Sequence, residues 1–96
     1  MKLLNAATAG TLESGDILIV LDKAPSGKGI EISLKSTVTN QFGKRIKQVI
    51  TETLNKIGVE GVSVDATDKG ALDCTIQARV KTAANRAFGI TKPTWD

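Results

Sequence analysis

Ser14 is the residue whose surroundings point most directly to chemistry. It lies between Glu13 and Gly15, and Asp16 follows. Glycine here favours a tight turn, because it adopts positive φ without a Cβ clash, and turn residues are accessible to other enzymes. A catalytic serine is disfavoured, since its hydroxyl would need a base and the sequence contains no His. The turn alone leaves open an ordinary surface serine, which is the more common case, or a serine that another enzyme modifies.

The remaining groups offer little for a catalytic or metal site. His and Tyr are absent and Cys74 is the single cysteine, so zinc, acid–base and nucleophilic sites lack their usual parts. Cys74 falls between Leu72 and Ile76, with only Lys69 nearby to activate the thiol, and we expect a buried structural cysteine. We predict no catalytic residue and no metal ligand. One cysteine forms no internal disulfide, which favours a reducing, cytoplasmic location.

The composition predicts one small domain, 1–96. Of its 96 residues 41% are hydrophobic, sufficient for a packed core. Lys and Arg number 13 against 10 Asp and Glu, and this net charge of +3 is too weak to indicate nucleic acid. Leu3 and Leu4 are too short an apolar stretch for a signal peptide, and residues 17–21, the longest apolar run, are too short for a membrane span. We expect no membrane partner.

Strand patterns surround the Ser14 turn and recur later in the chain. Residues 17–21 are continuously apolar and branched, which predicts a strand covered on much of both faces. Residues 30–35 alternate apolar and polar side chains, as in a half-buried strand. A further strand is predicted over 59–66, where Val62 and Val64 alternate with polar residues. The turn at Ser14 then forms a hairpin tip.

Two helices are predicted. Residues 38–57 carry one apolar stripe, with Ser36 or Thr37 as a cap and Gly58 as the stop. Gly43 interrupts this helix at a cost of about 1 kcal/mol, so we expect another backbone to pack closely there. Residues 72–87 satisfy both strand alternation and a helical stripe, and their length favours a helix that Asp68 caps and Gly89 stops.

The predicted fold class is α+β: a small antiparallel sheet of about four strands with two helices packed on one face. The strand order is not derivable from the sequence. The helices carry the basic excess, including Lys44, Arg45 and Lys47. Pro93 prevents the second helix from continuing, so residues 90–96 form a tail in which Trp95 packs on the domain or anchors a partner.

Four segments resemble the acyl carrier (gamma) subunits of citrate lyase. The first is Ala9-Gly10-Thr11-Leu12-Glu13-Ser14-Gly15-Asp16, which resembles the modification motif of that family. The others are Gln41-Phe42-Gly43 and the pair Asp68-Lys69-Gly70-Ala71-Leu72-Asp73-Cys74 and Ala78-Arg79-Val80, in matching order over essentially the whole chain. No departure occurs at the serine itself.

The resemblance implies a non-catalytic carrier domain over 1–96, in which Ser14 holds 2'-(5''-phosphoribosyl)-3'-dephospho-CoA through a phosphodiester. A dedicated prosthetic-group transferase would attach this arm. Its thiol would hold the acetyl or citryl group between the alpha (transferase) and beta (lyase) subunits during citrate cleavage to acetate and oxaloacetate. The implied partners are these two subunits and the transferase, in the cytoplasm of citrate-fermenting cells.

Two alternatives remain at this point. The carrier subunit of malonate decarboxylase resembles this sequence around Ser14 and uses the same arm, although residues 68–74 favour citrate lyase. The other is a small unmodified basic module that binds RNA or protein. It is weakened because the chain has only three aromatic residues for base stacking and lacks the Gly-x-x-Gly of a KH loop. Gly10 and Gly15 do not form a P-loop, since no Lys-Ser/Thr follows.

Overall fold

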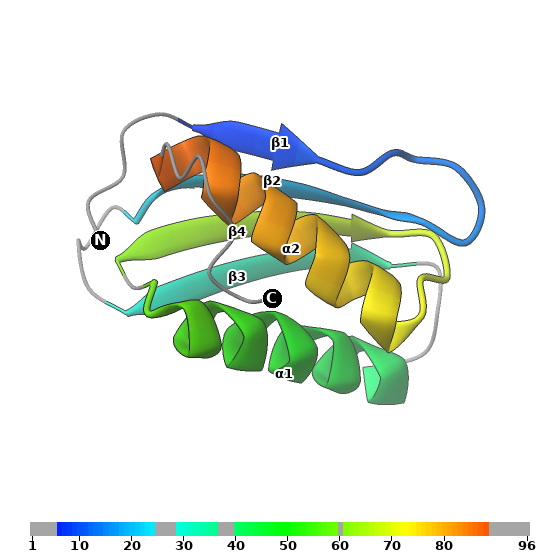
Figure 1. Ribbon diagram of the computed structural model, residues 1–96. Helices are drawn as coiled ribbons and strands as arrows, with labels where there is room; N and C mark the ends of the chain where they lie inside the picture. The colour runs from blue at the N-terminus through cyan, green and yellow to red at the C-terminus, as the bar shows by residue number, and fades with distance from the viewer. Residues whose placement is uncertain (1–5, 25–28, 37–39, 60, 89–96) are drawn as a thin grey trace.

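The structure, a computed structural model, describes residues 6–24, 29–36, 40–59 and 61–88, with the side chains of 40–42 left aside (Figure 1). It contains four strands and two helices over this part of the chain. In order they are β1 Ala7–Ala9, β2 Ile17–Lys23, β3 Ile30–Ser36, α1 Asn40–Ile57, β4 Val62–Asp68 and α2 Asp73–Phe88. The predicted α+β class with two helices is confirmed.

The strands form one mixed sheet in the order β1-β2-β4-β3. β1 and β2 are an antiparallel hairpin and β2 and β4 are also antiparallel, as predicted. The prediction of a wholly antiparallel sheet is wrong for β3 and β4, which run parallel. The reason is α1, whose 18 residues span about 27 Å and return the chain to the end of the sheet where β3 began.

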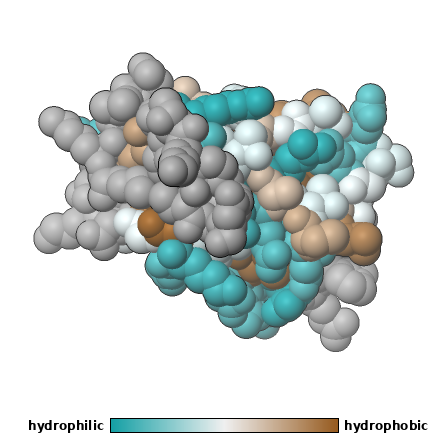
Figure 2. All heavy atoms as spheres, viewed as in Figure 1, coloured by the Kyte–Doolittle hydropathy of each residue, from teal (hydrophilic) through white to brown (hydrophobic). Residues whose placement is uncertain are grey.

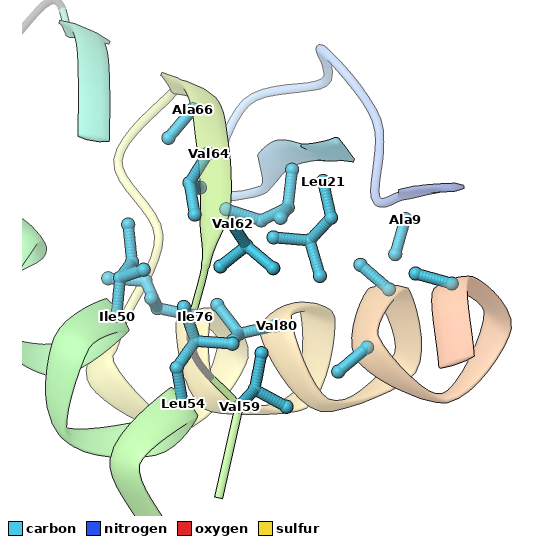
Figure 3. Close-up of a cluster of buried hydrophobic side chains, with 14 of the residues drawn as sticks. Ala9, Leu21, Ile50, Leu54, Val59, Val62, Val64, Ala66, Ile76 and Val80 are labelled. Carbon is cyan, nitrogen blue, oxygen red and sulfur yellow. The ribbon is translucent and has the colours of Figure 1, made fainter. Parts of the chain in front are cut away.

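Both helices cover the same face of the sheet, as predicted (Figure 1). α2 packs on β1 and β2, and α1 lies beside α2 along β3. The core between the layers consists of aliphatic side chains such as Leu21, Val64, Leu54 and Val80 (Figure 3). The other sheet face has no helix over it among the described residues, and there Glu31, which lies on β3, is exposed. The molecule is therefore a two-layer sandwich.

The two predicted strands that flank the core differ in detail from expectation. In β2, Ile17, Ile19 and Leu21 are buried under the helices, whereas the residues between them are only half-buried. The expectation that this strand is covered on both faces is thus wrong, because the helices lie on one side. β4 begins at Val62 rather than at Val59, since the amide of Val59 still donates to the carbonyl of Leu54, 2.9 Å away, as part of the helix stop.

α1 ends at the predicted residue, whereas the expectation of a closely packed backbone at its interior glycine, Gly43, is wrong. Gly58 has φ 85° and its amide donates to the Leu54 carbonyl at 3.0 Å, a left-handed stop. Among the described residues, a Cβ on Gly43 would meet the Leu34 side chain alone, at 3.6 Å, and no backbone of that part of the chain lies close. Ser36 is the last residue of β3, and Thr37 lies outside the described residues.

The ambiguous segment is helical, because its stripe Ile76, Val80, Ala83 and Ala87 is buried against the sheet. Leu72 does not belong to that buried stripe: it precedes the helix and is exposed, while its carbonyl accepts the amide of Ile76 at 3.0 Å. The expected cap by Asp68 is corrected below. Gly89, Trp95 and the tail 90–96 lie outside the described residues.

Candidate functional site

Ser14 lies in the loop 10–16 that joins β1 to β2. The amide of Asp16 donates to the carbonyl of Glu13 at 3.1 Å, which closes a turn with Ser14 and Gly15 in its middle, and Ser14 is exposed. β4 ends and both helices begin at this same end of the molecule (Figure 1). No described residue hydrogen-bonds to the Ser14 hydroxyl, which is therefore open to an approaching enzyme.

Two glycines shape the loop for different reasons. Gly10 has φ 97°, and a Cβ there would lie 1.8 Å from the carbonyl oxygen of Ile17. The loop can therefore close against the start of β2 only with glycine at position 10. Gly15 has φ 85°, but no atom of the described residues lies within 4 Å of a Cβ placed on it. The space beside Ser14 on this side is open.

The carboxylate of Asp16 holds the loop 10–16 in place through hydrogen bonds. Its carboxylate accepts hydrogen bonds from Arg79 on α2, Nε to Oδ1 at 3.0 Å and a terminal nitrogen to Oδ2 at 3.1 Å. It also accepts the hydroxyl of Thr11 at 2.8 Å and the amide of Ile17 at 2.7 Å. The Thr11 oxygen in turn accepts the amide of Glu13 at 3.1 Å. One buried carboxylate thus ties both sides of the Ser14 turn to α2.

These contacts favour the ionised form of Asp16. The Arg79 guanidinium and the amide of Ile17 lower the pKa of the Asp16 carboxyl from 3.8 to about 2, Thr11 adds to the lowering, and burial opposes it. The group is therefore a carboxylate throughout the physiological range. Having four donors on a carboxylate offsets the cost of burying its charge.

The segment that follows β4 also holds the Ser14 turn, through backbone hydrogen bonds. The amide of Gly15 donates to the carbonyl of Lys69 at 2.7 Å, and the amide of Lys69 donates to the carbonyl of Asp16 at 2.9 Å. Lys69 begins the connection between β4 and α2, so the sheet ladder of β2 and β4 continues into the Ser14 turn. The turn is consequently bound to two parts of the chain that lie more than fifty residues away in sequence.

Asp68, at the end of β4, organises that connection. Its carboxylate accepts the amides of Gly70 at 3.2 Å and Ala71 at 3.0 Å and the hydroxyl of Ser36 at 3.1 Å. The prediction that Asp68 caps α2 is wrong in this sense: the helix begins five residues later, and the carboxylate caps the turn before it. It thereby holds the segment against which the Ser14 turn rests.

The surface around the turn is partly apolar. The exposed large hydrophobic side chains of the described residues are Leu12, in the loop, and Leu72, just before α2. Figure 2 shows hydrophobic surface where α2 begins and a hydrophilic outer face on α1. A shallow hollow lies between the starts of the two helices, and at its rim Arg45 pairs with Asp73 at 2.6 Å. The two exposed leucines thus lie on the two segments that the hydrogen bond between the Gly15 amide and the Lys69 carbonyl joins.

The other sequence-predicted groups lie apart from this turn. Cys74 is exposed near the start of α2, so the expectation of a buried cysteine is wrong; the buried stripe is set by Ile76 and Val80. Lys44 and Lys47 lie exposed on α1. No group of three or more His, Cys, Asp or Glu in the described part of the chain could hold a metal ion, and none of its helices is long and apolar enough to cross a membrane.

Sequence reasoning did not identify Arg79 as a partner of the Ser14 loop. The two interacting residues are 63 positions apart. Arg79 was noted only within Ala78-Arg79-Val80, one of the segments that resemble the carrier family, and nothing in that segment pairs it with Asp16. The guanidinium of Arg79 reaches the Asp16 carboxylate only because α2 packs across the β1–β2 hairpin.

Comparison with known proteins defines the class of this protein. Residues 5–87 match the family model of the malonate decarboxylase delta subunit, an acyl carrier protein. The citrate lyase acyl carrier protein of Streptococcus uberis is 54% identical over 99% of this chain and 92% of its own length. That of Lactiplantibacillus plantarum is 51% identical over 100% and 98%, and that of Lacticaseibacillus casei 55% over 91% and 84%.

These matches, over nearly the whole chain, define an acyl carrier protein. More specifically, the chain belongs to the family of citrate lyase acyl carrier proteins, and its function is that of a non-catalytic carrier. The resemblance noted from four sequence segments is thereby confirmed. The alternative of an unmodified basic module that binds RNA or protein is set aside.

Proposed function

We propose that Ser14 is the attachment residue for 2'-(5''-phosphoribosyl)-3'-dephospho-CoA, and that the chain carries the acyl group between the alpha and beta subunits of citrate lyase. The observation that supports this most is an exposed hydroxyl on a turn that is fixed from two sides, at Asp16 and at the Lys69 backbone. Membership in an acyl carrier family implies a prosthetic group, and Ser14 stands in the segment that resembles the modification motif.

The residues present fit such a group. Ser14 and its neighbours Leu12 and Glu13 are exposed, and no described residue lies within 4 Å of a Cβ placed on Gly15. When bound, the group supplies a terminal thiol on which an acyl thioester can be held. The chain itself supplies the Oγ of Ser14 as the attachment atom and holds the turn on which that atom lies.

A separate transferase is needed to attach the group. The sequence has no His, and the carboxylate of Asp16 is ionised and fully occupied by Arg79, Thr11 and a backbone amide. Glu13 is the exposed carboxylate next to Ser14, and a carboxylate without a His is a poor base for a serine hydroxyl. We infer that the transferase supplies this base when it contacts the exposed turn.

The position of Ser14 also suits a carrier. A tether on an exposed loop keeps its end near the active sites that it serves, at an effective concentration on the order of millimolar for a short flexible linker. The turn lies at one end of a 33 × 28 × 20 Å molecule, so the body of the domain can contact the large subunits without covering Ser14.

Citrate lyase is favoured over malonate decarboxylase because the relatives matched over nearly the whole chain are citrate lyase carriers. We place the protein in the cytoplasm, where an unpaired, exposed Cys74 stays reduced.

Intact mass spectrometry of the protein from its native source during growth on citrate tests this proposal. The expected result is an added nucleotide-and-pantetheine mass that peptide mapping places on Ser14. Ser14→Ala should abolish the addition, whereas the control Ser33→Ala, at an exposed position on the open sheet face, should retain it. An unmodified wild-type chain recovered from cells with active citrate lyase would overturn the proposal.

A further inference from the structure

We propose that Asp16 and Arg79 act as positioning residues, a clamp that holds the Ser14 turn in the one conformation that the attaching transferase accepts. The inference rests on the proposed function of Ser14 and extends it to residues that the chemistry itself does not use. In this view the carrier is recognised by the shape of the turn as well as by its sequence.

The hydrogen bonds between Arg79 and Asp16 fix the orientation of the Asp16 carboxylate as well as its position. Arg79 uses two nitrogens of its planar guanidinium, one on each carboxylate oxygen of Asp16, so the plane of the carboxylate is set by α2. The same two oxygens accept Ile17 and Thr11, which lie on opposite sides of Ser14 in the loop. Rotation of the carboxylate would break bonds on both sides of the turn together.

The backbone beside Ser14 is fixed through the same carboxylate residue. Asp16 donates its amide to Glu13 and accepts Lys69 at its carbonyl, and the neighbouring Gly15 amide is bound to Lys69 as well. The peptide groups on either side of Ser14 therefore have set orientations, while the Ser14 side chain has none imposed by a described residue. This arrangement presents a free hydroxyl on a fixed support.

The burial of the clamp separates it from an ordinary surface ion pair. The Asp16 side chain is 13% exposed and that of Arg79 39%, whereas in the pair Arg45–Asp73 the side chains are 52% and 47% exposed. The latter pair joins α1 to the start of α2, and its hydrogen bonds run between the two side chains and not to the described loop 10–16. Arg45→Met is thus a matched control, the loss of an arginine from a helix-borne ion pair at the same end of the molecule.

The experiment measures loading of purified full-length apo protein in an extract of citrate-grown cells, with the protein concentration varied and Ser14 modification followed by intact mass. If the turn leaves its competent conformation most of the time, the apparent KM rises by the inverse of the competent fraction, roughly tenfold for one tenth. We expect this rise for Arg79→Met, a smaller one for Arg79→Lys, which keeps the charge without the fork, and none for Arg45→Met. Amide exchange of Gly15 and Lys69 should quicken in the same order.

The outcomes are distinct. If Arg79→Met loads at the wild-type KM although its Gly15 amide exchanges faster, the clamp is structural only and the positioning role is wrong. If Arg79→Met does not fold, Arg79→Lys and Thr11→Val decide instead, and wild-type KM values in both, with faster exchange, would again overturn the proposal. Failure of the wild-type chain to load at all would contradict the proposed function of Ser14 itself. The wild-type sample therefore tests that function, and the variants test the clamp.

Discussion

The Ser14 loop and the first turns of α1 lie at the same end of the molecule, and each contains a glycine and one residue of an Arg–Asp pair. In the loop, Gly10 has no room for a side chain and Asp16 accepts four donors. In α1, Gly43 has room for a methyl group, and Arg45 pairs with Asp73 where both are half exposed. A glycine and an Arg–Asp pair therefore contribute more to the loop than to α1. In the loop, one carboxylate makes all four hydrogen bonds, so a single substitution removes them together.

The largest effect should come from closing the space at position 10. Gly10→Ala places a Cβ 1.8 Å from the Ile17 carbonyl oxygen and leaves a positive φ, so we expect a loss of about 3 kcal/mol in the free energy of unfolding. Urea denaturation followed by circular dichroism measures it. Gly15→Ala is the control, since it has positive φ without the clash and should lose about 1–2 kcal/mol. Equal losses in the two variants would show that the Gly10 clash is relieved by a small shift.

The next effect separates the two ion pairs. Asp16→Ala leaves Arg79, Thr11 and the Ile17 amide without their acceptor, and we expect a loss of about 2–3 kcal/mol. Asp73→Ala removes the carboxylate of the exposed pair, and its denaturation midpoint should shift little, because solvent screens that interaction. If the two midpoints fell by the same amount, the distinction between the regions would be lost.

The pH dependence of stability should follow Asp16. Its pKa is lowered to about 2 in the folded protein against 3.8 ordinarily, so the ionised form stabilises the fold above about pH 4. As the pH falls from about 4 to about 2, the carboxylate is protonated and up to about 2 kcal/mol is lost. The measurement is urea denaturation at a series of pH values. Asp16→Asn should be less stable at pH 7 but should lack this component of the acid loss, and an unchanged acid profile would contradict the assignment.

The smallest effect should be a gain, at Gly43. Alanine is favoured over glycine inside a helix by up to about 1 kcal/mol, and the new Cβ would meet Leu34 at an ordinary contact distance of 3.6 Å. We therefore expect Gly43→Ala to raise the melting temperature without altering the loading of Ser14. A lower melting temperature would mean that α1 needs the glycine after all, and the contrast with Gly10 would weaken.

Local signals in the sequence were sufficient for most elements and for the candidate site. The Gly15 turn signal placed Ser14 on a hairpin tip, and the structure shows it exposed there. The stripe through Ile46, Leu54 and their neighbours predicted α1, and its stop at Gly58 was also correct. These features depend on residues that are close in sequence, where periodicity and turn preference act directly.

Other expectations failed where distant contacts decide. Gly43 was expected to meet a backbone but faces the Leu34 side chain. The parallel pairing of β3 with β4 could not be foreseen, because strand patterns are the same for either direction. In each case the answer depends on how whole elements pack rather than on the residues themselves.

The sequence by itself determined that this chain is an α+β domain with a serine on a glycine-flanked turn, because local geometry and hydrophobic periodicity are written in neighbouring residues. Only the tertiary structure decided what holds that turn. Asp16 meets Arg79 because α2 crosses the β1–β2 hairpin, and Gly15 meets Lys69 because β2 and β4 are antiparallel neighbours. Such contacts bring together groups more than fifty residues apart in sequence, and no local pattern specifies them.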